Sequence, residues 1–320
     1  MKQMMSTAVL TLAVACAAEL AWADGEKIAL FTKNQTNPFF QTVRVAAEDA
    51  AKQMHATITN YVPTKPDSIP EQMSQVEDAV TKRPDAVIFT PVDFKAMGPA
   101  LQKLNAAKIP VINITDRASG GEVVTFIGSD DYNLGLATGR YLLKKLNGEG
   151  SVIILEGVRG AVTSQERVRG FNKALEEYPK VKLLASQPGN YQRLQAMQVT
   201  ENLLQAHPKI DGVMAANDAM AMGVIEALDG ADRKALVVSI NATKEGVDAV
   251  KAGKLLATGD YNGFLQGCLG TLAAIRHLRK QSVPKEIVFP ASVIDASNYK
   301  GHELPDNQRS CPKWEEVVKG

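Results

Sequence analysis

The chain has 320 residues, of which 45% are hydrophobic and 22% are charged, and this usage is that of a globular protein rather than a disordered or collagen-like chain. The 36 Lys and Arg residues nearly balance the 35 Asp and Glu residues, so the formal net charge is +1, and no nucleic-acid partner is expected because such proteins carry a basic excess. The 3 cysteines are too few for a disulfide scaffold and lack the paired spacing of a zinc site.

Residues 1–23 have the features of a secretory signal peptide. Lys2 supplies a positive start, residues 8–18 are apolar, and Ala21-Trp22-Ala23 fits a small-x-small cleavage signal. The apolar run is too short to span a bilayer, which takes about 20 residues. A membrane anchor and a lipoprotein signal using Cys16 are the alternatives, but the residues before Cys16 fit the lipoprotein site poorly. We therefore expect cleavage after Ala23 and a periplasmic mature protein.

Removal of the signal peptide would leave Cys268 and Cys311 as the remaining cysteines. The compartment outside the cytoplasm permits disulfides, so these two residues are candidates for a disulfide. Sequence separation alone does not show whether their Cα atoms come close enough, and the pairing stays open at this point. The role of the tail, residues 298–320, is open as well.

Short β-branched or apolar runs alternate with longer amphipathic stretches along the rest of the chain. The predicted strands are 27–32, 57–62, 86–91, 111–115, 123–129, 151–157, 182–188, 212–218, 236–243, 255–261 and 287–295. Most of these runs are continuously apolar, as expected for parallel strands that are buried on both faces. So many strands are better divided between two sheets than held in one, and the length suits about two domains.

The stretches between the strands predict helices. Pro38 suits the first position of a helix, and Asp93 can cap the helix that follows it. The predicted helices cover 38–54, 94–107, 131–147, 163–177, 191–206, 217–229, 243–252 and 262–280. Ordered alternation of strands and helices predicts an α/β fold, with parallel sheets covered by helices on both faces.

Two lobes are expected, because the run 123–129 follows the preceding strand without an intervening helix. We place a crossing between the lobes near Gly128. No linker rich in Pro, Gly or Ser separates the halves, so ordinary strands rather than a tether join them. The predicted division is an N-terminal lobe of residues 24–128 plus 262–289, and a C-terminal lobe with tail of residues 129–261 plus 290–320.

Polar and aromatic residues gather where the predicted strands end, which is where open α/β sheets bind ligands. Planar amide, carboxylate and guanidinium groups can bind neighbouring hydroxyls in pairs, and aromatic rings can cover the apolar face of a sugar. Each residue alone has an ordinary explanation, such as helix capping by Asp93 or Asp218. Their joint occurrence predicts a ligand site made of Asn37, Phe39, Phe40, Thr90, Asp116, Arg117, Arg167, Tyr191, Asn217, Asn241 and Tyr261.

Motifs of nucleotide sites and of nucleophilic hydrolases are missing from the sequence. It contains no G-x-x-x-x-G-K-[ST] phosphate loop and no G-x-S-x-G elbow. The 4 histidines are scattered, and none falls at a predicted strand end. We therefore expect a binding cleft with no catalytic residue, no metal and no cofactor.

With these residues in place, the chain resembles the type I periplasmic solute-binding proteins of bacterial sugar ABC transporters, in the ribose-binding branch. The resemblance covers residues 24–295 and rests on motifs in the family's order, namely Asn37-Pro38-Phe39-Phe40, Pro110-Val111, Asp116-Arg117, Gly128-Ser129-Asp130, Gln165-Glu166-Arg167, Gly170-Phe171, Ala185-Ser186-Gln187-Pro188, residues 216–221, Lys254-Leu255 and Ala257-Thr258. It implies two Rossmann-like lobes joined by a three-strand hinge. It also implies a monosaccharide or sugar alcohol bound between the lobes, permease subunits of an ABC transporter as partners, and a monomer.

The resemblance assigns Phe40 as the ring that stacks on the sugar, and it also marks three departures. Thr90 stands where the ribose-binding pattern has Asn, Asn241 where it has Asp, and Tyr261 where it has Gln. An amide in place of a carboxylate changes which hydroxyls can be bound, so the departures favour another pentose, a hexose, a sugar alcohol or a cyclic polyol. An acidic sugar stays open as well, because the two arginines of the predicted site outnumber its carboxylate.

Three other classes of protein are the alternatives. A repressor-type transcription regulator would carry a helix-turn-helix before the first strand, where this chain has the predicted signal peptide. An exported enzyme acting on sugars could use Asp116 and Asp93 as an acid/base pair, but Arg117 beside Asp116 would keep that carboxylate ionised. A sugar-sensing receptor module is the third alternative, and a chemoreceptor as an additional partner stays open.

Overall fold

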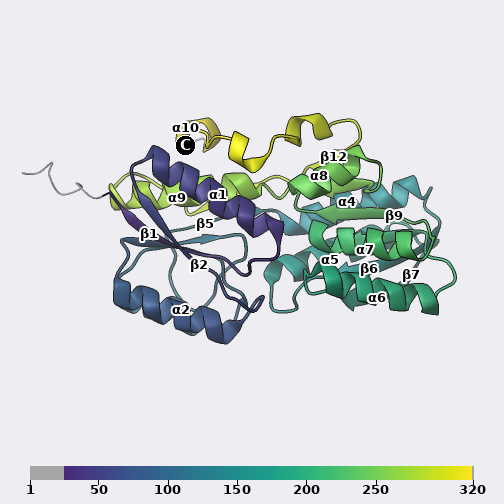
Figure 1. The fold of residues 1–320 in the computed structure, drawn as a ribbon, viewed down its shortest axis with the longest axis horizontal. Coiled ribbons are helices and arrows are strands. Elements are labelled where there is room, and N and C mark those ends of the chain that lie inside the picture. The colour runs from purple at the N-terminus through teal and green to yellow at the C-terminus, as the bar shows by residue number, and fades with distance from the viewer. Residues whose placement is uncertain (1–24, 319–320) are drawn as a thin grey trace, which may run out of the picture.

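The computed structural model describes residues 25–318, which form two α/β lobes lying side by side (Figure 1). Residues 1–24 and 319–320 lie outside the described part, and the predicted signal peptide is among them. No helix within residues 25–318 is both long enough and apolar enough to cross a membrane.

The N-terminal lobe is built on a sheet of six parallel strands in the order β11-β5-β4-β3-β1-β2. The strands are β1 (Lys27–Phe31), β2 (Thr57–Tyr61), β3 (Ala86–Phe89), β4 (Val111–Ile114), β5 (Thr125–Ser129) and β11 (Glu286–Phe289). Alternate residues of β1 pack on opposite faces of this sheet, against α1 (Pro38–Gln53) and α9 (Gly263–Leu278) on one face and against α2 (Ile69–Lys82) and α3 (Gly98–Ala106) on the other. The sheet is therefore covered on both sides.

The C-terminal lobe holds a second six-stranded sheet, in the order β12-β10-β9-β8-β6-β7. Its strands are β6 (Gly150–Glu156), β7 (Val181–Pro188), β8 (Gly212–Ala215), β9 (Leu236–Ile240), β10 (Ala257–Gly259) and β12 (Val293–Asp295), of which β12 alone pairs antiparallel. Its helices are the packed pair α4 (Asp131–Lys145) and α5 (Val162–Glu176), the packed pair α6 (Arg193–Ala206) and α7 (Asp218–Gly230), and α8 (Lys244–Lys251). The predicted α/β fold with two sheets is confirmed.

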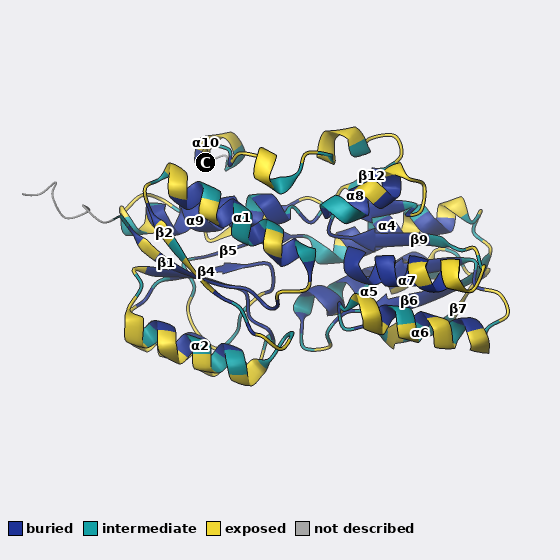
Figure 2. Ribbon diagram, viewed as in Figure 1, coloured by how far each residue is buried: buried dark blue, intermediate teal, exposed yellow. Residues whose placement is uncertain are grey.

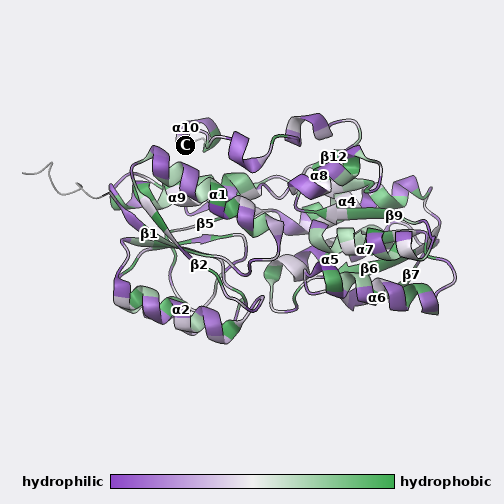
Figure 3. Ribbon diagram, in the orientation of Figure 1, coloured by the Kyte–Doolittle hydropathy of each residue, from purple (hydrophilic) through white to green (hydrophobic). Residues whose placement is uncertain are grey.

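The strands at the centre of each lobe are both buried (Figure 2) and hydrophobic (Figure 3). In β6 the four consecutive residues from Val152 to Leu155 have no exposed surface, and in β3 the same holds from Ala86 to Phe89. Continuous burial of this kind arises because helices cover both faces of a parallel sheet. It also explains why these strands were recognisable as unbroken apolar runs.

The chain crosses between the lobes three times, between β5 and α4, between β10 and α9, and between β11 and β12. The third crossing corrects the sequence prediction of a single strand over 287–295. The structure divides this run into β11 and β12, which belong to different sheets. Pro290 follows β11 directly, and proline has no backbone N–H with which to continue the hydrogen-bond ladder.

Two helices differ from the sequence prediction. Helix α2 was not among the predicted helices, although its apolar residues Met73, Val76 and Val80 recur at helical spacing and pack against the core of the lobe. Helix α3 begins at Gly98 rather than at residue 94. Asp93 still caps backbone N–H groups, those of Lys95 and Ala96, but it does so in a turn that precedes the helix.

The C-terminal tail packs on both lobes, and it runs along one edge of the molecule in Figure 1. Its first short helix, η1 (Tyr299–His302), contacts α8, and its second, η2 (Asp306–Gln308), contacts α1. Cys311 then forms a disulfide with Cys268 of α9, with 5.5 Å between the two Cα atoms. The sequence placed the whole tail with the C-terminal lobe, whereas the structure ties its last part to the N-terminal lobe.

Candidate ligand site between the lobes

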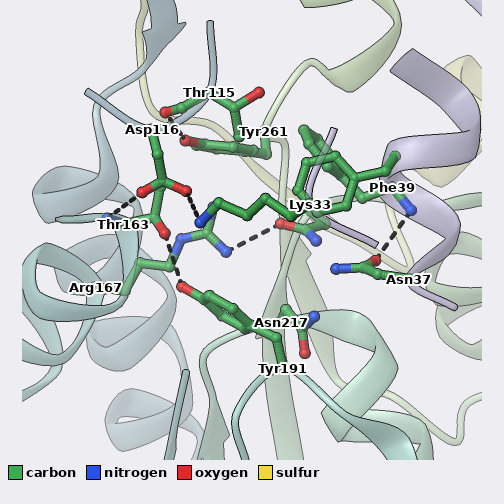
Figure 4. Close-up of a pocket in the computed structure, with 12 residues that line it drawn as sticks. Lys33, Asn37, Phe39, Thr115, Asp116, Thr163, Arg167, Tyr191, Asn217 and Tyr261 are labelled. Carbon is green, nitrogen blue, oxygen red and sulfur yellow. Dashed lines mark hydrogen bonds and ion pairs between the residues drawn. The ribbon is translucent and has the colours of Figure 1, made fainter. Parts of the chain in front are cut away.

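A small cavity with about 280 Å³ of empty space lies between the lobes, where the strands of both sheets end (Figure 4). Its lining comes from both lobes and from the second crossing, and consists of Lys33, Asn37, Phe39, Phe40, Thr115, Asp116, Thr163, Arg167, Tyr191, Asn217, Asn241 and Tyr261. All of the predicted site residues except Thr90 and Arg117 therefore lie around one space. That they bind a ligand stays a prediction.

The two lobes touch each other around this cavity. The backbone N–H of Thr163 in the C-terminal lobe donates to Oδ1 of Asp116 in the N-terminal lobe at 3.0 Å. Nearby, the N–H of Phe94 donates to the carbonyl of Gly160 at 2.9 Å, again across the gap between lobes. Direct hydrogen bonds between the lobes mark a closed arrangement of a two-lobed protein.

The start of helix α1 forms the apolar wall of the site. Asn37 is the N-cap of α1, and its Oδ1 accepts the N–H of Phe39 at 3.1 Å, while Pro38 takes the first helical position. The Phe39 ring lies edge-on to Phe40 and tilted against Tyr261, with 5.3 Å between ring centroids in both pairs. These buried rings give the cavity a surface suited to the C–H face of a sugar.

Lys33 is a site residue that the sequence analysis missed. It comes two residues after β1, and its side chain is 2% exposed. Its Nζ contacts the carboxylate of Asp116, which is also buried, and makes no hydrogen bond of normal geometry within the described chain. The ammonium group therefore has N–H donors left for a ligand. Extending the survey of strand ends by one residue beyond Thr32 would have found it.

Thr115 and Thr163 also line the cavity and were not predicted. Thr115 is the residue directly after β4, and Thr163 lies in the first turn of α5. Both hydroxyls hydrogen-bond other side chains, since Thr115 Oγ1 donates to Oε1 of Gln266 and Thr163 Oγ1 lies 3.0 Å from the hydroxyl of Tyr191. Threonine at a strand end carries no signal that separates a lining residue from an ordinary one.

Arg167 on α5 is held firmly by the C-terminal lobe. Its Nε donates to Oδ1 of Asp131 at 2.8 Å, and its Nη1 donates to the carbonyl of Ala216 at 2.7 Å and to Oδ1 of Asn241 at 3.0 Å. Burial alone would lower the pKa of Arg167, but electrostatic interactions with Tyr191 and Asp131 outweigh burial and raise it. The guanidinium is therefore a fixed cation in the site.

Tyr191 and Asn217 complete the side of the cavity formed by the C-terminal lobe. Tyr191 has a left-handed backbone with φ of 59°, and burial raises the pKa of its hydroxyl, which stays neutral. Asn217 is the N-cap of α7, and its Oδ1 accepts the N–H of Met220 at 2.9 Å. The Nδ2 of Asn217 is buried and has no hydrogen-bond partner in the described chain, so it is available to donate a hydrogen bond to a ligand.

Arg117 and Thr90 lie away from the cavity. In the turn after β4, the side chain of Asn113 bonds both the carbonyl of Asp116 and the N–H of Ala118. Asp116 then faces the cavity, while the half-exposed guanidinium of Arg117 pairs with Glu286 and lies 3.9 Å from the Phe126 ring centroid.

Thr90 was also predicted to line the site, but it is fully buried and does not do so. Its backbone carbonyl accepts a hydrogen bond from Nε2 of Gln72 in α2, at 2.9 Å. Its position directly after a strand is the same as that of Thr115, so the distinction depends on the local direction of the chain.

Comparison with known proteins shows which family the chain belongs to. The family described as "Periplasmic binding protein domain" matches residues 28–282. The chain belongs to that family. The ribose import binding protein RbsB of Haemophilus influenzae is 33% identical over 269 residues, which cover 84% of this chain and 91% of that protein.

Solved structures agree in fold. An ABC transporter periplasmic solute-binding protein from Actinobacillus succinogenes, with bound D-allose, has a TM-score of 0.82 and 34% identity, covering 86% of this chain and 99% of that one. An ABC transporter solute-binding protein from Bacillus halodurans, with bound myo-inositol, has a TM-score of 0.80 and 26% identity, covering 88% and 98%. These relatives are named as binding proteins and not as enzymes. The chain is thus a type I periplasmic sugar-binding protein, and the predictions of family, two-lobed fold and lack of enzymatic activity are confirmed.

Proposed function

We propose that the protein captures a monosaccharide or sugar alcohol between its lobes and delivers it to the permease of an ABC transporter. The observation that carries this proposal is that both lobes and a crossing segment contribute buried polar groups to one small cavity. The cavity is small and most of its lining side chains are buried, which suits a small solute held out of water. The ligands named for relatives, which are ribose, allose, xylitol and myo-inositol, support the same class.

Ligand-driven closure follows from the division of the site between lobes. A solute that touches Phe40 and Asp116 on one side and Arg167 and Asn217 on the other makes its full set of contacts only when the lobes are together. It therefore binds the closed state better and shifts the equilibrium toward it. An epimer that leaves one buried partner unpaired loses about 1–3 kcal/mol.

A protein of this kind carries its bound solute to the transporter in the membrane. We propose that the mature protein is periplasmic and monomeric, and that its closed form docks on permease subunits. Relatives named as periplasmic binding proteins of ABC transporters support this location and this partner. Deleting the gene should abolish high-affinity uptake of the solute that binds the purified protein, and uptake that is unchanged in the deletion strain would contradict delivery.

Ligand binding is tested first by a melting screen against pentoses, hexoses, polyols and uronic acids, followed by calorimetry. Arg167→Ala and Phe40→Ala should lose most of the affinity for the solute that raises the melting temperature. The matched control is Arg169→Ala, because Arg169 is on the same helix but is exposed and pairs with Glu166. Affinity that survives Arg167→Ala, or no stabilisation by any member of the panel, would overturn the proposal.

A further inference from the structure

Three amide side chains line the cavity, and the oxygen of each already accepts one hydrogen bond. The Oδ1 of Asn37 accepts from Phe39 N–H, that of Asn217 from Met220 N–H, and that of Asn241 from Arg167. What these residues offer a ligand is mainly the amide NH₂ group, which is a donor. At Asn217 this donor is fully buried and unpaired in the described chain.

The two cations of the cavity add further donors. The ammonium of Lys33 has one ionic partner, Asp116, and no hydrogen bond of normal geometry in the described chain. The guanidinium of Arg167 donates through Nε and Nη1, while its Nη2 donates to no other group within residues 25–318. Both side chains are no more than 3% exposed, so water does not readily satisfy these donors.

Acceptors are scarce by comparison. The single carboxylate of the lining, Asp116, already bonds Thr163 N–H through Oδ1 and contacts Lys33 through Oδ2. The carbonyl of Thr115 takes the hydroxyl of Tyr261. A neutral polyol brings one O–H donor with every hydroxyl, so in this cavity several of its donors would compete for few acceptors.

A carboxylate has the opposite character, because it only accepts hydrogen bonds and carries the charge that complements the lining. Lys33 and Arg167 face the cavity against one carboxylate, while Asp131, the ion-pair partner of Arg167, does not line it. We propose that the preferred ligand is an acidic sugar, an aldonate or uronate whose carboxylate binds between Lys33 and Arg167. This inference rests on the proposed function and narrows its substrate class. Charge-assisted hydrogen bonds to a carboxylate are about twice as strong as neutral ones.

Calorimetry of the wild-type protein at constant ionic strength, with matched pairs of neutral and acidic ligands, tests which class of sugar it prefers. The pairs are D-ribose with D-ribonate, D-glucose with D-gluconate and D-glucuronate, and xylitol with D-xylonate, with acetate as the plain anion. We expect an acidic member to bind at least about ten-fold more tightly than its neutral partner, which is about 1.4 kcal/mol. Neutral members that bind equally or better would overturn this inference and leave the proposed function standing. If no ligand of the panel binds, both this inference and the proposed function are wrong.

A second measurement uses Asn217→Asp, which keeps an N-cap acceptor for Met220 but replaces the buried donor by a carboxylate. Affinity for the acidic sugar should fall at least ten times more than affinity for its neutral partner, because only the former meets a like charge. The control is Ser68→Asp, which adds the same charge at the N-cap of α2, outside the cavity lining. Equal losses for the acidic and neutral ligands in Asn217→Asp would overturn the inference.

Discussion

The guanidinium carbon of Arg167 lies 4.2 Å from the ring centroid of Tyr261, in the second crossing between the lobes. The Tyr261 hydroxyl lies 2.9 Å from the carbonyl of Thr115 in the N-terminal lobe and 3.1 Å from Oδ2 of Asp131 in the C-terminal lobe. One side chain of the crossing therefore touches both lobes and the cation of the site. The ring of Tyr261 contacts Arg167, whereas its hydroxyl contacts the two lobes, so substitutions can test the two contributions separately.

Replacing Tyr261 by Phe and by Leu should separate those contributions. Tyr261→Phe keeps the ring beside Arg167 but leaves the buried Thr115 carbonyl without its donor, so we expect a loss of about 1–2 kcal/mol in the free energy of unfolding and a ligand affinity within a few-fold of wild type. Tyr261→Leu also removes the cation–π contact, worth up to about 2 kcal/mol when desolvated, and should weaken binding by about ten-fold or more. Urea unfolding and calorimetry measure the two effects, and equal affinities of the Phe and Leu variants would contradict the assignment.

Lobe closure should be sensitive to a single methyl group at Gly160. A Cβ at this position would lie 1.8 Å from Oδ2 of Asp93 in the opposite lobe, next to the hydrogen bond between Phe94 and Gly160. Gly160→Ala should therefore disfavour the closed state, and overpacking of about 1–3 kcal/mol corresponds to an affinity loss of about 5- to 150-fold. Stability without ligand should be unchanged, because the clash exists only when the lobes meet.

Calorimetry and small-angle scattering with and without ligand measure the effect of Gly160→Ala. Adding Asp93→Ala should restore part of the affinity, since it removes the atoms that the new methyl group meets. Gly230→Ala is the control, because a Cβ at Gly230 meets nothing within 4 Å. Wild-type affinity in Gly160→Ala would show that closure does not bring these two loops together in solution.

Much of the site could be predicted because the carboxyl ends of parallel strands meet at one edge of a sheet. Asn217 and Asn241 follow neighbouring strands β8 and β9, so their proximity follows from strand order alone. Asn37 and Asn217 are also N-caps, and the capping position fixes which way their amides turn. Local chemistry and strand position therefore sufficed for residues such as these.

The direction of a side chain in a turn could not be predicted from position alone. Asp116 and Arg117 are adjacent, yet one faces the cavity and the other pairs with Glu286 on the outside. The bonds of Asn113 that shape this turn come from a side chain in the strand, which no pattern in the sequence announces. Lys33 was missed for a related reason, since a lysine after a strand is ordinarily exposed and its burial depends on Asp116, which is distant in sequence.

The disulfide of the tail should contribute strongly to stability. It closes a loop between Cys268 and Cys311, which are 43 residues apart, and the chain-entropy relation gives about 4 kcal/mol for a loop of this length. The Cys268→Ala/Cys311→Ala variant should lose up to that amount in urea unfolding, and a reductant should destabilise the wild type but not the variant. A variant as stable as the wild type would mean that the contacts of the tail with α1 and α9 hold it without the covalent link.

Asp131 should give the protein an unusual dependence of stability on pH. Burial raises the pKa of its carboxyl from 3.8 to about 6, even though Arg167 acts in the opposite direction. A carboxyl whose pKa is raised by folding takes up protons more readily in the folded state, so it adds stability at pH values below about 4. That contribution is lost as the pH rises through about 6. A difference of about two units corresponds to about 3 kcal/mol.

The measurement is urea unfolding of the wild type and of Asp131→Asn between pH 3.5 and 8, which is roughly the window in which this carboxyl titrates. Since other groups titrate alike in both proteins, the difference between their free energies of unfolding isolates Asp131. The wild type should lose stability relative to the variant as the pH rises from about 4 to about 6, and the difference should be constant above about 7. A difference that grows in favour of the wild type with rising pH would show instead that the ion pair with Arg167 outweighs burial and holds the pKa of Asp131 below its ordinary value.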